Sequence, residues 1–312
     1  MCSSDLGSTW IGNENSSDFR EPKSSAHRTP QLALGGTTFA DISGHEGRNR
    51  CGRRFATTRR LSGSPGRRSC HGWHWHRPCW LTEMANLHLA QRLIDTLPPS
   101  RPGLFNPWRD WCDEDDRSGE QSGPEGRLRR LAEHLDCEPR YLVCGQSPGW
   151  RGCRYSGIAF TSERLLLDGT VPRVPALPHR LTRAGPDGRP LSEPSATIVW
   201  KSLHRLGIAH ETVLWNALQM HPHHLSNPCS NRTPTWSEIE LGAPALEMLL
   251  ETFPDALVIS IGNKSEELLR ELDLMPTAQL RHPAYGGARK FANSLRDFVE
   301  SNRTTPPRSA GD

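Results

Sequence analysis

Apolar residues along most of the chain fall into two kinds of run, one with helical spacing and one extended. Spacings of three and four residues predict amphipathic helices at 84–97, 127–135, 195–206, 264–272 and 291–299. Short, mostly apolar runs predict buried strands at 141–144, 212–217 and 256–261, and a short fourth strand is expected at 279–281. Gly207 is expected to end the third helix, and Asn263 with Glu266 to cap the fourth. Strands that alternate with helices predict a parallel sheet covered on both faces.

The remaining segments lack such a pattern. Residues 98–124 are rich in Pro, Asp and Gly, which predicts a linker after the first helix. Residues 1–83 show no apolar period and carry scattered Ser, Gly, Arg and His, so we expect a disordered extension there. Met84 opens the first regular segment and is our candidate for the true start. The folded domain is then expected at 84–301, with a flexible tail at 302–312.

Composition and charge separate the extension from the rest. The mean hydropathy is −0.63, with 27 Gly and 26 Pro in 312 residues, which is too polar for one packed domain of this length. Residues 1–83 hold 12 Lys and Arg against 7 Asp and Glu, and the remainder holds 26 against 28. No apolar run approaches the roughly 18–20 residues of a membrane span. With no secretory signal and nine Cys lacking CxxC spacing, we expect reduced thiols and a cytoplasmic location.

Two features of the extension resemble binding sites. One is a group of five metal-ligand residue types, Cys70, His71, His74, His76 and Cys79. Its spacing fits no common zinc signature, so we predict no metal site. The other is a set of arginine pairs at 53–54, 59–60 and 67–68, which we interpret as part of a solvated tail.

Polar residues gather where three of the predicted strands end. The first strand is followed by Gly145-Gln146-Ser147-Pro148-Gly149, and the second contains Asn216 near its end. The last is followed by His282-Pro283-Ala284-Tyr285-Gly286-Gly287. Each alone has a structural explanation, as a turn, a loop contact or a strand end. Parallel strands bring their carboxyl ends to one edge, so together they predict a ligand site.

These motifs resemble, in order, those of the uracil-DNA glycosylase superfamily, most closely the branch whose first motif reads G-E-A-P-G. The match covers about residues 141–299. It comprises the first motif at 145–149, the aromatic Phe160, Asn216 within L-W-N-A, N-R-T-P-T at 231–235 with Glu238, and the His-Pro motif at 282–287. The resemblance implies an α/β fold, a three-layer α/β/α sandwich with a central four-stranded, mainly parallel sheet. It also implies hydrolysis of the N-glycosidic bond of uracil in DNA, leaving an abasic site.

The resemblance also implies a role for each matching residue. Phe160 would stack on a flipped base, Asn216 would read its Watson–Crick edge, and His282 would donate to O2 as negative charge builds. The first motif would position base and water through Gly145, Gln146, Ser147, Pro148 and Gly149. The duplex would be entered by Tyr285, Gly286 and Gly287. Apart from the resemblance, basic residues cluster near the motifs, which predicts phosphate contacts by Arg151, Arg154, Arg281, Arg289 and Lys290. The alternative for Arg289 and Lys290 is a solvated helix N-terminus.

Elementary chemistry agrees with these roles. A base must leave the duplex to be reached, which costs a few kcal/mol, and an aromatic face returns roughly 1–3 kcal/mol by stacking. An amide has the donors and acceptor that suit uracil, whereas cytosine presents the opposite pattern. A neutral imidazole donor aimed at the departing anion is worth on the order of 3 kcal/mol. Hydrolysis by this route needs a placed water and no metal.

The sequence departs from the family pattern at three places. Ser147 stands where other branches have Asp or Asn, and Gln146 where the nearest branch has Glu, so the loop has no carboxylate to act as base. His221 or His223 are candidates for holding the water instead. Met220 and Gly242 occupy two positions where that branch has cluster-binding Cys, so we predict no iron–sulfur cluster and no cofactor.

The third departure concerns substrate choice. Gly149 occupies the position at which a Tyr can exclude the 5-methyl group of thymine, and Trp150 or Tyr155 are candidates to fill that space. The sequence therefore leaves alternatives: a glycosylase for another base, such as hypoxanthine or mismatched thymine, or a slow or non-catalytic binder of damaged bases. The expected partner is DNA, single- or double-stranded, and we expect a monomer.

Overall fold

The structure is a computed structural model that describes residues 79–303. Its helices are α1 (Cys79–Asp95), α2 (Gly123–His134), α3 (Cys153–Ser156), α4 (Glu163–Leu167), α5 (Pro194–Leu206), α6 (Trp236–Ile239), α7 (Ala243–Thr252), α8 (Asn263–Glu271) and α9 (Ala288–Asn302). Its strands are β1 (Leu104–Phe105), β2 (Tyr141–Gly145), β3 (Thr212–Asn216), β4 (His221–Pro222), β5 (Leu257–Ile261) and β6 (Ala278–Leu280). Within this range no helix is both long and apolar enough to cross a bilayer.

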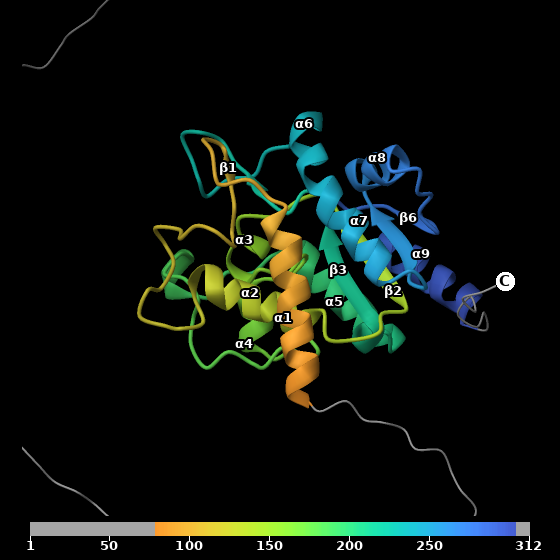
Figure 1. Cartoon of the computed structure of the whole chain (residues 1–312), viewed down its shortest axis with the longest axis horizontal. Helices are drawn as coiled ribbons and strands as arrows, with labels where there is room; N and C mark the ends of the chain where they lie inside the picture. The colour runs from red at the N-terminus through yellow and green to blue at the C-terminus, as the bar shows by residue number, and fades with distance from the viewer. Residues whose placement is uncertain (1–78, 304–312) are drawn as a thin grey trace, which may run out of the picture. The chain divides into compact units, whose positions relative to one another are not determined.

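A four-stranded parallel sheet forms the centre of the structure (Figure 1). The strand order is β3-β2-β5-β6, and every neighbouring pair is parallel. All residues of β2 and β3 are buried, which explains why their sequences are mostly apolar. Gly145 pairs with Asn216 at the carboxyl ends of these two strands. The four predicted strands and their parallel arrangement are confirmed.

Alternation along the strands divides the core into two layers. Tyr141 and Val143 of β2 face one side, where they pack with residues of α5 and α9. Leu142 and Cys144 face the other side, where they pack with residues of α1, α2, α7 and α8. Helices therefore cover both faces, with α1 and α7 in contact on one of them (Figure 1). This is the three-layer α/β/α sandwich that the sequence predicted.

One of the two predicted helix ends, the end of α5, is confirmed. Pro194 stands at the first position of α5, and Gly207 ends that helix in the left-handed conformation with φ 74°. The predicted cap of α8 is wrong. Gly262 is the capping residue and Asn263 is the first helical residue, so the side chain of Asn263 does not cap the helix. Glu266 is paired instead with Arg270, one turn further along.

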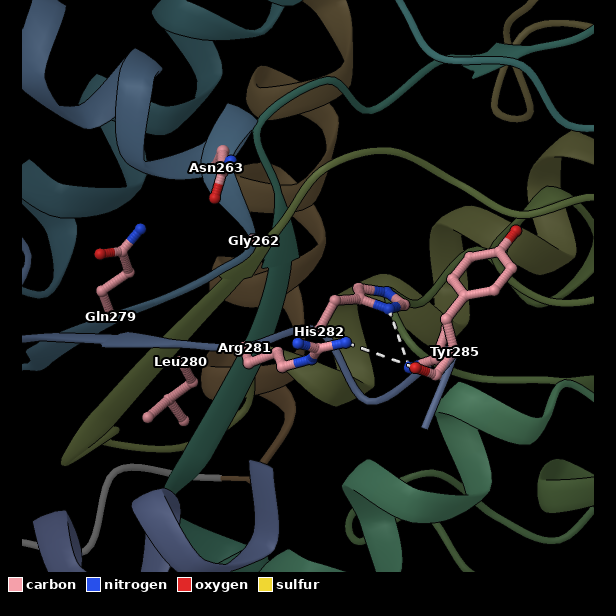
Figure 2. A pocket seen from close by; sticks show the side chains of 8 residues that line it. Gly262, Asn263, Gln279, Leu280, Arg281, His282 and Tyr285 are labelled. Carbon is pink, nitrogen blue, oxygen red and sulfur yellow. Dashed lines mark hydrogen bonds between the residues drawn. The ribbon is translucent and has the colours of Figure 1, made fainter. Parts of the chain in front are cut away.

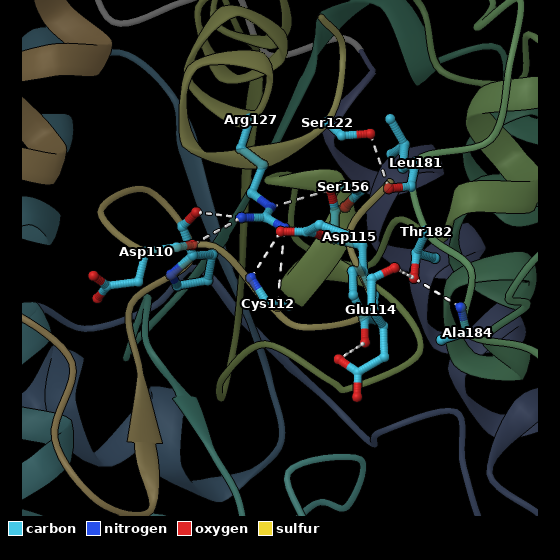
Figure 3. A network of polar contacts seen from close by, with 12 residues as sticks. Asp110, Cys112, Glu114, Asp115, Ser122, Arg127, Ser156, Leu181, Thr182 and Ala184 are labelled. Atoms are coloured by element: carbon cyan, nitrogen blue, oxygen red, sulfur yellow. Dashed lines mark hydrogen bonds and ion pairs between the residues drawn. The ribbon is translucent and has the colours of Figure 1, made fainter. Parts of the chain in front are cut away.

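The segment predicted to be a linker, residues 98–124, is instead part of the folded core. Leu104, Trp108 and Cys112 are buried, and β1 pairs with β4 as a short antiparallel ribbon. A buried ion pair between Arg127 of α2 and Asp115 holds the segment in place (Figure 3). Arg127 also donates to the carbonyl oxygens of residues 107 and 110. Pro and Gly suggested a free connection, but buried partners on α2 order this segment.

Helix α1 begins at Cys79, five residues before Met84. Predictions for residues 1–78, including the arginine pairs and the Cys and His group up to residue 76, lie outside the described residues. So do predictions for residues 304–312 of the tail.

Candidate active site

Gly145 is the point at which two of the predicted site residues, Phe160 and Asn216, meet. A Cβ atom added to Gly145 would lie 2.5 Å from the ring of Phe160 and 3.0 Å from Oδ1 of Asn216. The ring and the amide therefore face the end of β2 together, and only glycine leaves room for both. Asn216 arrives there because β3 pairs in parallel register with β2.

The buried ring of Phe160 is held in a strained backbone conformation. Its φ is 49°, in the left-handed region that costs a bulky residue roughly 1–3 kcal/mol. The loop around it is fixed by Ser156, whose hydroxyl donates to the Thr161 carbonyl at 2.8 Å. Trp200 of α5 donates to the Thr161 hydroxyl at 3.0 Å. A strained aromatic that is fixed from both sides is a feature of binding sites.

His282 lies against Phe160, with ring centroids 6.1 Å apart and planes tilted by 37°. The backbone N–H of Ala284 donates to Nδ1 of His282 at 3.2 Å (Figure 2). Since Nδ1 accepts, the proton of the neutral ring lies on Nε2. Burial lowers the pKa of His282, so the ring is neutral near pH 7. His282 is thus a neutral donor through Nε2.

Asn216 is 5% exposed, yet its amide makes little use of its hydrogen-bonding capacity. Among residues 79–303 its side chain has one hydrogen-bond partner, Sγ of Cys153, 3.9 Å from Nδ2. Sulfur is a weak acceptor, and burial raises the pKa of Cys153, which keeps it a thiol. A buried amide with so weak a partner is available to a ligand.

The first-motif loop is fastened by its backbone. Leu218 N–H donates to the Gln146 carbonyl at 2.9 Å, and Trp150 N–H donates to Oδ1 of Asn231 at 2.9 Å. Pro148 is buried, whereas Gln146 and Ser147 are half-buried. Within the described range, neither of these two side chains forms a hydrogen bond to another residue.

The residues after His282 form a tight, exposed turn. Tyr285 is 99% exposed with φ 50°, and Gly286 has φ 75°. A Cβ at Gly287 would lie 2.1 Å from the His282 carbonyl oxygen, so this position requires glycine. Arg281 donates to the Tyr285 carbonyl at 3.3 Å, and the Tyr285 ring points away from Asn263 and Gln279 (Figure 2). The turn presents an aromatic side chain to solvent.

A pocket of about 460 Å³ lies beside this turn. Its lining includes His282, Arg281 and Tyr285, together with Gly262 and Asn263 from the turn between β5 and α8 (Figure 2). Phe160 and Asn216 are not part of the lining.

The five predicted basic contacts divide into exposed and buried groups. Arg289 and Lys290 are exposed in the first turn of α9, and Arg281 and Arg151 are also exposed. Arg154 is 4% exposed and its guanidinium lies 2.8 Å from Nδ1 of His221. The expectation that Arg154 contacts a phosphate is therefore wrong.

The two histidines suggested as water holders have other partners. His221 is buried, with Nδ1 bound to Arg154 and Nε2 2.9 Å from the Ser230 carbonyl. Burial lowers the pKa of His221 to about 3, so it stays neutral. His223 stacks on it at 5.5 Å and bonds the His224 carbonyl. Both ring nitrogens of His221 are occupied, so the expectation that His221 holds the water is wrong.

The N-R-T-P-T stretch and Glu238 serve the fold. Arg232 binds Glu238 through two contacts of 2.7 Å, one to each carboxylate oxygen. Arg232 also donates to the Gly103 carbonyl at 2.9 Å, and Thr235 with Glu238 forms a capping box for α6. The motif therefore ties the β1 segment to α6.

The residues at the cluster-binding positions do not fit an iron–sulfur cluster. Gly242 offers no thiolate, and a Cβ there would lie 1.7 Å from the Ala217 carbonyl oxygen. Met220 is buried in the apolar core. Across residues 79–303 no three His, Cys, Asp or Glu side chains gather as a metal site would require.

Sequence reasoning missed Glu193, the residue that precedes α5. A Cβ at Gly149 would lie 3.4–3.5 Å from its carboxyl atoms, and one at Gly152 would lie 1.8 Å from its Oε2. Burial raises the pKa of Glu193 to about 7. Glu193 is 44 residues beyond Gly149, and no motif marked it.

Comparison with known proteins places the chain in a family. The family model of the uracil DNA glycosylase superfamily matches residues 132–304. Among curated proteins none matches the chain. Similar solved structures include SMUG2 from Pedobacter heparinus, at 14% identity, 70% coverage of this chain, 99% of that one and a TM-score of 0.48. Another is UNG from Nitratifractor salsuginis, at 15% identity, 71% and 97% coverage, and a TM-score of 0.35. Since the family match spans more than half of the sequence, the chain belongs to the uracil DNA glycosylase superfamily, and its general activity is that of a DNA glycosylase.

Proposed function

We propose that this glycosylase removes uracil from DNA by hydrolysing the N-glycosidic bond, which leaves an abasic site for base-excision repair. The observation that carries the proposal is that Phe160 and Asn216 both face Gly145 at the end of β2, and that the His282 ring lies against Phe160. An aromatic face, an amide and a neutral imidazole are the groups needed to hold an extruded pyrimidine and stabilise it as an anion.

Base selection falls to Phe160 and Asn216. The ring stacks on the flipped base, which is worth roughly 1–3 kcal/mol. Oδ1 of Asn216 accepts from N3–H of uracil, and Nδ2 donates to O4. Cytosine offers an acceptor at N3 and a donor at C4, so buried groups would be left unpaired. Such mismatches discriminate by about 10⁴-fold.

His282 acts on the leaving group. Its Nε2–H donates to O2 as the glycosidic bond breaks and charge moves onto the base. The Ala284 N–H fixes the ring through Nδ1, so the donor is oriented before the substrate binds. A donor of this kind contributes on the order of 3 kcal/mol, or about 10²-fold in rate.

The exposed turn acts on the DNA. Tyr285 enters the duplex where the nucleotide has left, and Gly286 and Gly287 form the tight turn that presents it. Arg289 and Lys290 bind phosphates from the start of α9. The protein acts as a monomer in this proposal, with no cofactor.

A second candidate function is a glycosylase that accepts another base. Gly149 favours it, because the side chain that can exclude the 5-methyl group of thymine is missing at this position. Tyr155 is buried with its hydroxyl 3.4 Å from Glu114, and the ring of Trp150 lies under Arg151. Neither contact supports a ring that takes the place of the missing side chain. A carboxyl group, that of Glu193, adjoins Gly149 instead. This arrangement leaves thymine less strongly excluded than cytosine.

A single-turnover assay tests both candidates. Oligonucleotides carrying uracil, cytosine, mismatched thymine or hypoxanthine are incubated with excess protein, and alkali then cuts abasic sites. We expect release of uracil and none of cytosine, with loss of release in an Asn216→Ala, His282→Ala double variant. Release of another base in preference to uracil would favour the second candidate. Tight binding of uracil-containing DNA without release would reduce the protein to a binder of damaged bases.

A further inference from the structure

Glu193 differs from the fully buried carboxylates of the structure, because it is half-buried and its side chain has no protein partner within residues 79–303. Glu163 accepts backbone N–H groups of Leu181 and Leu191 at 2.6 and 2.9 Å. Asp115 is paired with Arg127. For the Glu193 carboxylate, residues 79–303 provide neither a hydrogen bond nor an ion pair. These buried carboxylates are paired and support the fold, whereas a half-buried carboxylate with a raised pKa beside a candidate site is a candidate for a functional role.

Its position connects it to the site. The carboxyl group lies against the Gly149–Gly152 turn, which belongs to the first-motif loop. The next residue, Cys153, places its sulfur 3.9 Å from the amide nitrogen of Asn216. Gly152 is needed for this approach, because a Cβ there would overlap Oε2 of Glu193. The loop thus brings a distant carboxylate to the motif that lacks one.

We propose that Glu193 supplies the carboxylate that Ser147 and Gln146 cannot, holding the attacking water and accepting its proton. This inference rests on the proposed hydrolysis of the glycosidic bond. Ser147 and Gln146 are neutral, so they can orient a water without removing its proton. A carboxylate beside this loop also stabilises the positive charge that develops on the sugar.

The step balances as a hydrolysis. The bond between C1′ of the sugar and N1 of uracil breaks, and its electron pair leaves with the base, where His282 stabilises the charge on O2. The water oxygen forms a new bond to C1′, and one water proton passes to Glu193. That proton then returns through solvent to the uracil anion. The products are an abasic sugar and neutral uracil, and Glu193 is ionised again.

The surroundings of Glu193 give its carboxyl group a pKa suited to a general base near neutral pH. Burial raises the pKa of Glu193 to about 7, so both forms are populated there. The titratable neighbour on the adjoining turn is Cys153, whose pKa is itself raised by burial and by Glu193. Arg151 on that turn is exposed and lies over Trp150, 4.7 Å from the ring centroid. A base of this kind predicts a rate that rises with pH until Glu193 is ionised.

The test compares wild type with Glu193→Gln in single-turnover release of uracil between pH 5 and 9. Glu251→Gln, at an exposed position on α7, is the control for loss of one negative charge. Wild type and the control should show a rate that rises to a plateau above about pH 7. Glu193→Gln should be slower by at least about 10²-fold at pH 8 and lose the rise with pH. Its affinity for uracil-containing DNA should remain.

A second variant separates chemistry from folding. In Glu193→Ala, added formate should restore part of the rate, because a small carboxylate can occupy the vacated space. A residue that only supports the loop would give no such rescue. If wild type releases uracil and Glu193→Gln does so with the same rate and pH profile, this inference is overturned and the proposed function stands. Failure of wild type to release uracil at every pH would overturn the proposed function as well.

Discussion

The ring centroids of Phe160 and His282 lie 6.1 Å apart, although the two residues are separated by 122 positions in the sequence. Phe160 follows the short helix α3, and His282 follows the last strand of the sheet. The ring is fixed by a left-handed backbone and the imidazole by the Ala284 N–H. Both groups are therefore oriented before any base arrives, which favours stabilisation of charge in the transition state.

Substitution of Gly145 tests the meeting point itself. In Gly145→Ala the new methyl would overlap the Phe160 ring and press on Asn216, so we expect uracil release to fall by at least about 10²-fold. Stability should fall by about 1–3 kcal/mol, as for an overpacked core. Gly119→Ala is the control, because its Cβ would meet nothing nearer than 3.9 Å. Equal activity in both variants would show that Gly145 does not shape the site.

Tyr285 is expected to matter for duplex DNA and not for folding. Glycine removes the strain of φ 50°, so Tyr285→Gly should be as stable as wild type within about 1 kcal/mol. Uracil release from duplex DNA should fall by about tenfold, because nothing replaces the flipped base. Release from single strands should change much less. Met275→Gly, another exposed apolar position, serves as control. An equal loss on both substrates would contradict a role in the duplex.

Glu193 makes a prediction about stability that is independent of activity. Its pKa of about 7 in the folded protein exceeds the ordinary 4.5, so the folded state binds more protons between these values. Stability should therefore fall as pH rises from 4.5 to 7. Glu193→Gln lacks this loss. Above pH 7 its free energy of unfolding should exceed that of wild type by on the order of 2 kcal/mol. Thermal melts across pH measure the difference, which should vanish below pH 4.5.

Truncation tests the expectation for the extension. A chain that starts at Met84 loses the first five residues of α1 but keeps the buried positions from Ala90 to Leu97. We expect it to fold and to release uracil as the full chain does. Loss of a cooperative melt or of activity would show that residues before Met84 contribute.

The sequence predicted the sheet well because three of its four strands, β2, β3 and β5, are short, mostly apolar runs with a clear end. It failed where order depends on partners distant in the sequence. The segment at 98–124 looks like a linker until Arg127 pairs with Asp115. Asn263 looks like a cap until Gly262 takes that place.

Prediction of the candidate site from the sequence also failed where residues depend on distant partners. Asn216 and His282 stand at strand ends, where a parallel sheet gathers polar residues, so sequence reasoning could select them. Glu193 precedes a helix and reaches the loop only through tertiary packing against two glycines. Arg154 looked like a surface cation, but the packing of Phe105 under its guanidinium buries it. Contacts of this kind have no local signature.

The most direct test of the account is single-turnover release of uracil by wild type, Asn216→Ala and His282→Ala. Wild type should cut a uracil-containing strand after alkali and leave a cytosine-containing strand intact. Each variant should lose at least about 10²-fold while keeping its fold by thermal melting. Wild-type rates in both variants would contradict the claim that this amide and this imidazole hold and release the base.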